Sequence, residues 1–119
     1  MFKIADRGLG VLLILGAAGH TMGSIRTYGR EPMTLLWALS ATLYILLLAA
    51  VHLLRTARPG DHALAWIGVA GALCQVAAAV AFGELIGDPA DPRVIGFVAI
   101  CLGLTAFGLR YALAKGAIA

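Results

Sequence analysis

Four long apolar blocks, separated by short polar turns, dominate this sequence of 119 residues. Each block is long enough to cross the ~30 Å hydrocarbon core of a bilayer, which takes ~20 apolar residues in a helix. Only 13% of the residues are charged, whereas a soluble domain typically carries ~25%, so the chain has too little polar surface to cover itself in water. We therefore predict an all-α integral membrane protein, a bundle of four transmembrane helices in a single domain that spans 1–119.

Proline and glycine residues in the three turns place the helix boundaries. The predicted helices cover about 5–25, 34–55, 62–86 and 92–115. We expect Thr34 to cap the second helix, and Asp91 to cap the fourth with Pro92 at its first position. The N-terminal segment has features of a signal peptide, but we interpret it as the first membrane helix.

The basic residues are distributed unequally between the two predicted membrane faces. Six of the nine Lys and Arg residues fall on the side of the termini, and three fall on the other side (Arg26, Arg30 and Arg93). Because loops on the cytoplasmic side are enriched in Lys and Arg, we expect both termini to be cytoplasmic, in the inner (plasma) membrane of a bacterium. The net charge of +3 is then a topology signal. We therefore expect contacts with membrane lipids and no nucleic-acid partner.

The first predicted helix contains a histidine, His20, in the half of the membrane opposite the termini. An ionisable residue inside a transmembrane segment is costly to bury and is a candidate functional residue by default. His20 shares a helix face with Gly16, Gly19 and Gly23, and small residues mark close helix contacts in membranes. We therefore expect its imidazole to point into the bundle, as a candidate acid or base. The alternative is that it only hydrogen-bonds a neighbouring helix.

The next two helices supply further polar side chains at similar depth. Trp37, Ser40 and Tyr44 form a stripe at helical spacing on the second helix, although Trp37 also fits an interfacial anchor. Gln75 lies near mid-membrane and needs a partner inside the bundle, for which Tyr44 is at the right level. Together with His20, and with Arg26 at the mouth, these residues predict a polar pocket in the outer half.

Glu84 is the acid that a catalytic role for His20 would need, and it is the second catalytic candidate. It follows Gln75 by nine residues, so a regular helix directs it to the opposite side. It turns inward only if the helix loosens at Gly83 or Gly87. We carry Glu84 forward as a candidate that depends on that loosening.

The other histidines and the cysteines predict neither a metal site nor a cofactor. His52 and His62 fall at the cytoplasmic edge, where we expect interfacial positions, and two ligands alone make a poor metal site. His20 lies at the opposite membrane surface, so it cannot bridge a haem with His52. Cys74 and Cys101 sit inside apolar segments and are expected to pack as small hydrophobic residues.

Three functions fit these observations. The first is binding of a lipophilic small molecule in the outer-half pocket around His20, with acid–base conversion of that molecule as an extension. The second is an accessory or assembly subunit of a larger membrane complex, in which the polar residues only join helices. The third is a small transporter formed by homo-oligomerisation through glycine-rich faces. The sequence alone does not decide whether the chain is an enzyme.

Overall fold

The computed structural model describes residues 1–115, and four helices joined by short turns make up this part of the chain. The four helices are α1 (Phe2–Tyr28), α2 (Pro32–Ala57), α3 (His62–Leu85) and α4 (Pro92–Ala112). All four are long and apolar enough to cross a membrane, which confirms the predicted helix content. The last four residues of the predicted domain, 116–119, lie outside the described part.

The observed boundaries differ from the predicted ones at several helix ends. Helix α1 starts before the predicted residue 5, because the polar residues of its first turns fold into the helix and Asp6 is buried. Helix α2 starts at Pro32, with Glu31 as the N-cap in place of Thr34, because a proline suits the first turn. Asp91 caps α4, as predicted, and accepts a hydrogen bond from the Arg93 backbone.

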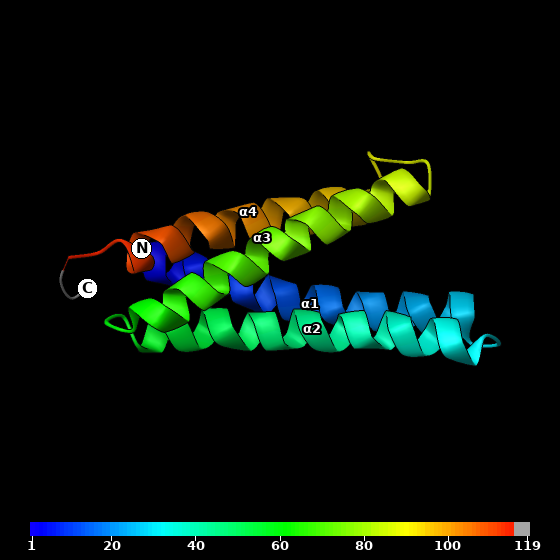
Figure 1. Ribbon diagram of the computed structural model, residues 1–119, viewed down its shortest axis with the longest axis horizontal. Coiled ribbons are helices and arrows are strands. Elements are labelled where there is room, and N and C mark those ends of the chain that lie inside the picture. Colours follow the sequence, from blue (N-terminus) through cyan, green and yellow to red (C-terminus); the bar gives the residue numbers. More distant parts are fainter. Residues whose placement is uncertain (116–119) are drawn as a thin grey trace.

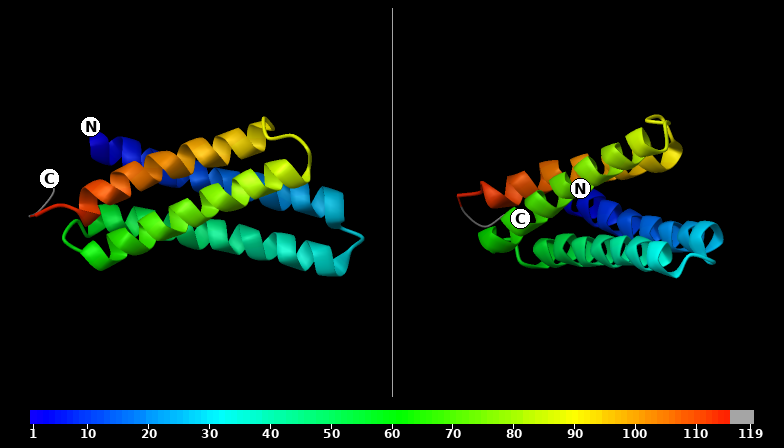
Figure 2. Two further views of the ribbon diagram at one scale, coloured as in Figure 1. Left: turned by 45° about the horizontal axis from the view of Figure 1, so that its top comes forward. Right: turned by 45° about the vertical axis from the view of Figure 1, so that its right-hand side comes forward.

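The helices form two antiparallel hairpins, α1–α2 and α3–α4, and each helix packs chiefly against its hairpin partner. The hairpins meet where α1 begins and α4 ends, and they diverge toward the loops 29–31 and 86–91 (Figures 1 and 2). We call the first region the closed end and the second the diverging half. The start of α1 and the end of α4 therefore lie at the same end of the molecule.

The apolar core occupies the middle of the bundle and the closed end. One cluster contains eight buried residues: Leu13, Ala17, Ile45, Leu48, Ala49, Ala72, Cys101 and Leu104. A smaller one, nearer the closed end, contains Ala65, Tyr111 and Ala112. Most contacts between the hairpins are therefore made in the middle and at the closed end. Within residues 1–115, the helix faces beyond these contacts have no partner helix.

Candidate functional site

His20 lies on α1 where the core ends and the diverging half begins. It follows the buried residues Leu13 and Ala17 on the inward face of the helix. A Cβ atom on Gly16 would come within 3.0 Å of the Phe97 ring on α4, so the two helices still touch there. A Cβ atom on Gly19 or Gly23 would meet nothing within 4 Å. His20 therefore continues the inward face just past the contact with α4.

Hydrogen bonds to α2 fix the orientation of the His20 ring. Its Nδ1 lies 2.8 Å from the Thr42 hydroxyl, which also accepts a hydrogen bond of 3.2 Å from the Thr21 hydroxyl. The Thr21 hydroxyl also donates to the Ala17 carbonyl at 2.9 Å, so it shares one proton between two acceptors, and the direction of the bond between His20 and Thr42 depends on the tautomer of the ring. Among residues 1–115, Nε2 makes no hydrogen bond. The alternative of a purely inter-helix role therefore accounts for Nδ1 and leaves Nε2 available for another partner.

The predicted stripe of Trp37, Ser40 and Tyr44 begins, at Tyr44, on the face of α2 that contacts α3. Its other two residues lie beyond this contact. The Tyr44 hydroxyl donates to the Gly71 carbonyl on α3 at 2.6 Å, which joins the two hairpins. Trp37 and Ser40 lie beyond that contact on the same face. Trp37 is 69% exposed, and the Ser40 hydroxyl donates only to the Leu36 carbonyl of its own helix. The three side chains thus share a face, but no helix covers its outer part.

Beside Tyr44 the surface forms an apolar groove between α2 and α3. Its volume is about 240 Å³, and it is lined by Tyr44, Leu47, Leu48, Val51, Ile67 and Gly71. Gln75 is buried on α3, one turn beyond Gly71. The expected pairing of Gln75 with Tyr44 is wrong, because the Tyr44 hydroxyl meets α3 a turn earlier and donates to Gly71.

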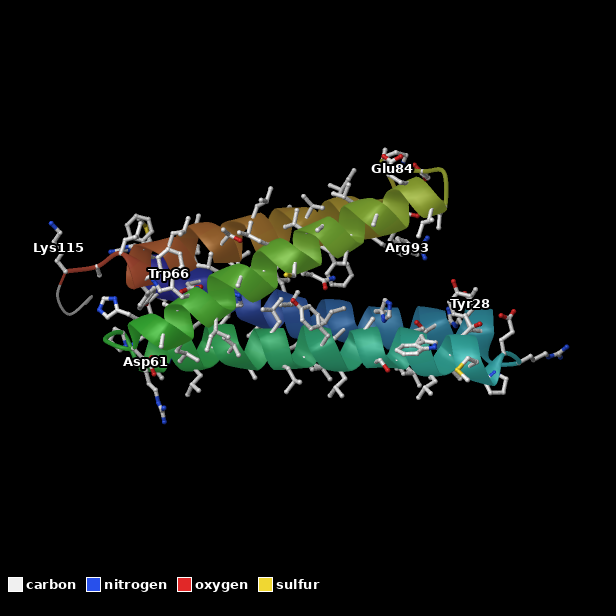
Figure 3. All side chains as sticks on the ribbon, in the orientation of Figure 1. Tyr28, Asp61, Trp66, Glu84, Arg93 and Lys115 are labelled. Atoms are coloured by element: carbon white, nitrogen blue, oxygen red, sulfur yellow. The ribbon has the colours of Figure 1, made fainter. Side chains whose placement is uncertain are left out.

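The charged residues at the end of the diverging half are not arranged as expected for the mouth of the predicted pocket. Glu84 and Arg26 are both exposed. Glu84 points away from α1 and α2, so the helix does not loosen to bring it toward His20 (Figure 3). Arg93 and Tyr28 instead point toward each other from α4 and α1 (Figure 3).

Arg93 is held by two neighbours at this position. Its guanidinium lies 5.2 Å from the centre of the Phe82 ring and pairs with the Asp91 carboxylate at 2.8 Å. The side-chain hydrogen bond from Arg93 lowers the pKa of Asp91 to about 2. The Arg93 cation is thus already paired within its own loop, and sequence reasoning had counted it only as a topology signal.

The closed end contains a polar cluster that sequence reasoning missed. Arg55 of α2 is fully buried and forms an ion pair with Asp6 of α1, which is 1% exposed. The same guanidinium donates to the Leu104 carbonyl at 3.3 Å and lies 5.1 Å from the centre of the Tyr111 ring, both on α4. One side chain therefore joins three helices.

His52 lies one turn before Arg55 and is 1% exposed. The expectation that it is an interfacial histidine is wrong, because α3 packs over it at Gly68. A Cβ atom on Gly68 would lie 3.1 Å from the His52 ring, and one on Gly108 would lie 2.8 Å from Arg55. The two glycines therefore make room for the large polar side chains, which explains how they fit between the helices.

A sequence signal for this cluster exists in the spacing of α1. Asp6 falls on the same face as Gly10, Leu13 and Ala17, the face that is buried throughout the helix. Tyr111 on α4 is buried as well, because it packs over the Arg55 guanidinium.

The remaining candidate ligands do not converge. No group of three or more His, Cys, Asp or Glu residues within 1–115 is arranged to hold a metal ion. His62 bonds through Nδ1 to the Ala112 carbonyl at 3.0 Å, at the surface of the closed end. Cys101 is buried and Cys74 is exposed, and both are free thiols.

Comparison of the chain with protein-family models, with curated proteins and with solved structures finds no match. The functional argument therefore depends on the geometry of the chain itself.

Proposed function

We propose that the chain is an integral membrane protein whose four helices all cross a bacterial inner membrane, with both termini in the cytoplasm. Four helices of sufficient length and hydropathy support the insertion. Six basic residues at the closed end support the orientation: Lys3, Arg7, Arg55, Arg58, Arg110 and Lys115. The diverging half then lies in the outer half of the bilayer.

We further propose that the diverging half binds a lipophilic small molecule between the two hairpins. The carrying observation is that His20 lies on the inward face of α1, that its Nδ1 is bonded to Thr42, and that its Nε2 makes no hydrogen bond within residues 1–115. His20 is half-buried, and in the tautomer with the proton on Nε2 this atom would donate to an acceptor oxygen of the ligand. Its apolar part would lie against Trp37, which is 69% exposed on the face of α2 beyond the Tyr44 contact.

The other predicted residues have supporting positions in this proposal. The Gln75 amide, on the next turn of α3 from the Tyr44 contact, would offer a second polar contact, and Arg26 would lie at the membrane surface. An imidazole exchanges protons near neutral pH, so His20 is the proposed acid or base for any conversion of the ligand. Glu84 has no part in it, because its side chain points away (Figure 3).

The two tryptophans allow a direct test of this proposal. Trp66→Phe leaves Trp37 as the reporter in the diverging half, and Trp37→Phe leaves Trp66 as a matched control near the closed end. Each variant in lipid nanodiscs is titrated with a doxyl-labelled fatty-acid methyl ester, which carries an acceptor carbonyl and quenches tryptophan fluorescence. We expect saturable quenching of Trp37, weakened by His20→Ala, and only linear, partition-driven quenching of Trp66. Equal linear quenching of both tryptophans, unchanged by His20→Ala, would contradict binding of this ligand class.

A second candidate is a subunit of a homo-oligomer or larger membrane complex, as an accessory protein or a small transporter. It is favoured by the open space over Gly19 and Gly23, since small residues at this spacing let another helix approach closely. Replacing both glycines by leucine would then shift the mass of the protein in mild detergent to that of a monomer. An unchanged mass would count against this candidate.

A further inference from the structure

The polar cluster at the closed end contains groups that the rest of the described chain leaves unsatisfied. The second carboxylate oxygen of Asp6, both ring nitrogens of His52 and Nε of Arg55 are buried without a hydrogen-bond partner. Native structures leave few such groups, and those that occur usually bind water or an ion or have a functional role. Among these atoms, the free oxygen of Asp6 belongs to the carboxylate that is paired with the buried Arg55 guanidinium.

The contacts of Arg55 show what the Asp6 charge does. Arg55 has one charged partner, Asp6, while its contacts on α4 are a carbonyl and an aromatic ring. Removing the negative charge would leave a buried guanidinium with neutral neighbours only, which is a strongly unfavourable state. Water is close, because Asp6 lies about one helical turn, ~6 Å, from the start of α1. Arg55 would therefore be driven toward the membrane surface, away from α1 and α4.

The titratable and charged groups around Asp6 come from each helix of the closed end. On α1, the guanidinium of Arg7 donates to the Thr56 hydroxyl at 3.0 Å. Helix α2 contributes His52 and Arg55, and α4 contributes Tyr111. At the start of α3, Asp61 caps the Leu64 backbone and His62 bonds to α4. Among these groups, Asp6 is the acid in contact with the guanidinium that joins the helices.

We propose that Asp6 is a proton-binding site that latches the closed end of the bundle. A proton from the aqueous phase adds to the free carboxylate oxygen, the ion pair with Arg55 is lost, and the two hairpins separate at this end, which uncovers the part of α3 and α4 beside the Arg55 guanidinium. Loss of the proton to the same aqueous phase restores the pair and closes the end. The latch is independent of any ligand near His20, because its parts lie at the opposite end of the helices.

A cysteine introduced at a buried position of the closed end can report this opening. Ala65 is fully buried in the small cluster with Tyr111, whereas Arg58 is exposed in the adjacent turn. Ala65→Cys and Arg58→Cys are made separately in a background with Cys74→Ala and Cys101→Ala. Both proteins, in nanodiscs, react with a positively charged methanethiosulfonate reagent. The ratio of the two rates measures opening and cancels the shared effect of pH on thiol reactivity.

We expect the rate ratio of Ala65→Cys to Arg58→Cys to rise at least about tenfold between pH 8 and pH 5, because the buried unpaired guanidinium drives the opening. Asp6→Asn should give the high ratio already at pH 8, and Asp6→Glu should keep the pH dependence. The double variant Asp6→Asn/Arg55→Met lacks both charges and should stay closed at every pH. A constant ratio in the parent protein would overturn the proposal, even if Asp6→Asn fails to fold. A pH-dependent ratio that persists in the double variant would overturn it as well.

Discussion

The two ends of this bundle differ in how the polar side chains of its apolar helices are bonded and buried. At the closed end, Asp6 and Arg55 are fully enclosed, and one guanidinium joins three helices. In the diverging half, the polar groups of His20 and Thr42 bond within one hairpin, and the faces toward the other hairpin are uncovered. The comparison indicates that the closed end holds the hairpins together, and it is the basis for proposing a binding site in the other half.

The largest effect is expected from breaking the closed end with Arg55→Met alone. This variant leaves the Asp6 carboxylate buried without its charged partner, so unfolding should become easier by about 3–5 kcal/mol. The free energy of unfolding is measured by far-UV circular dichroism during titration with SDS in mixed micelles. The double variant Asp6→Asn/Arg55→Met should recover most of the loss. Equal stability of Arg55→Met and the parent would show that the pair does not hold the fold.

A second test compares one glycine from each region. In Gly108→Ala, the new methyl group would lie 2.7 Å from Val69 and 2.8 Å from Arg55. Overpacking of this kind typically costs about 1–3 kcal/mol. The matched control is Gly96→Ala on the same helix, where the methyl group meets nothing within 4 Å. The same SDS titration should show a loss for Gly108→Ala only, and similar losses for both would remove the packing difference between the regions.

A smaller effect is expected from the hydrogen bond in the diverging half. Thr42→Val keeps the shape of the side chain but removes the hydroxyl that bonds His20 and Thr21. Hydrogen bonds between membrane helices contribute about 0.6–2 kcal/mol, so the loss should be well below that of Arg55→Met. If Thr42→Val proved as damaging as Arg55→Met, stability would not be concentrated at the closed end.

The smallest effect concerns Asp91, in the loop before α4. Hydrogen bonding to Arg93 lowers its pKa from 3.8 to about 2. A lowered folded-state pKa means that the stabilisation is complete above pH 3.8 and is lost as the pH falls toward about 2. The Asp91 carboxyl carbon, followed by NMR, should titrate near that lower value. Arg93→Gln should move the midpoint up, and an unmoved midpoint would exclude the ion pair.

The sequence predicted the helices well because their signals are local. Length and hydropathy identify four segments able to span a membrane, and Asp91 with Pro92 marks the start of α4 through its own capping geometry. The stripe of Trp37, Ser40 and Tyr44 follows from the helical period alone, and the structure keeps it on one face.

The tertiary contacts were less predictable because they depend on how helices cross. Asp6 and Arg55 are 49 residues apart, and each alone resembles an interfacial charge at a helix end. Their burial depends on Gly108 and Tyr111 of α4, which no local pattern links to them. The Tyr44 hydroxyl likewise donates to the Gly71 carbonyl and not to Gln75, because the crossing point of α2 and α3 sets which residues meet.

The asymmetry between the two ends is the central claim, and distances between spin labels test it most directly. One pair is placed at the closed end, on exposed Lys3 and Leu113, and the other in the diverging half, on exposed Thr27 and Ala90. Cys74 and Cys101 are replaced by alanine, and double electron–electron resonance is recorded in nanodiscs. We expect a narrow distribution at the closed end, and in the diverging half a broader one that tightens when the doxyl-free methyl ester is added. Equally narrow distributions at both ends, unchanged by the ester, would contradict the account.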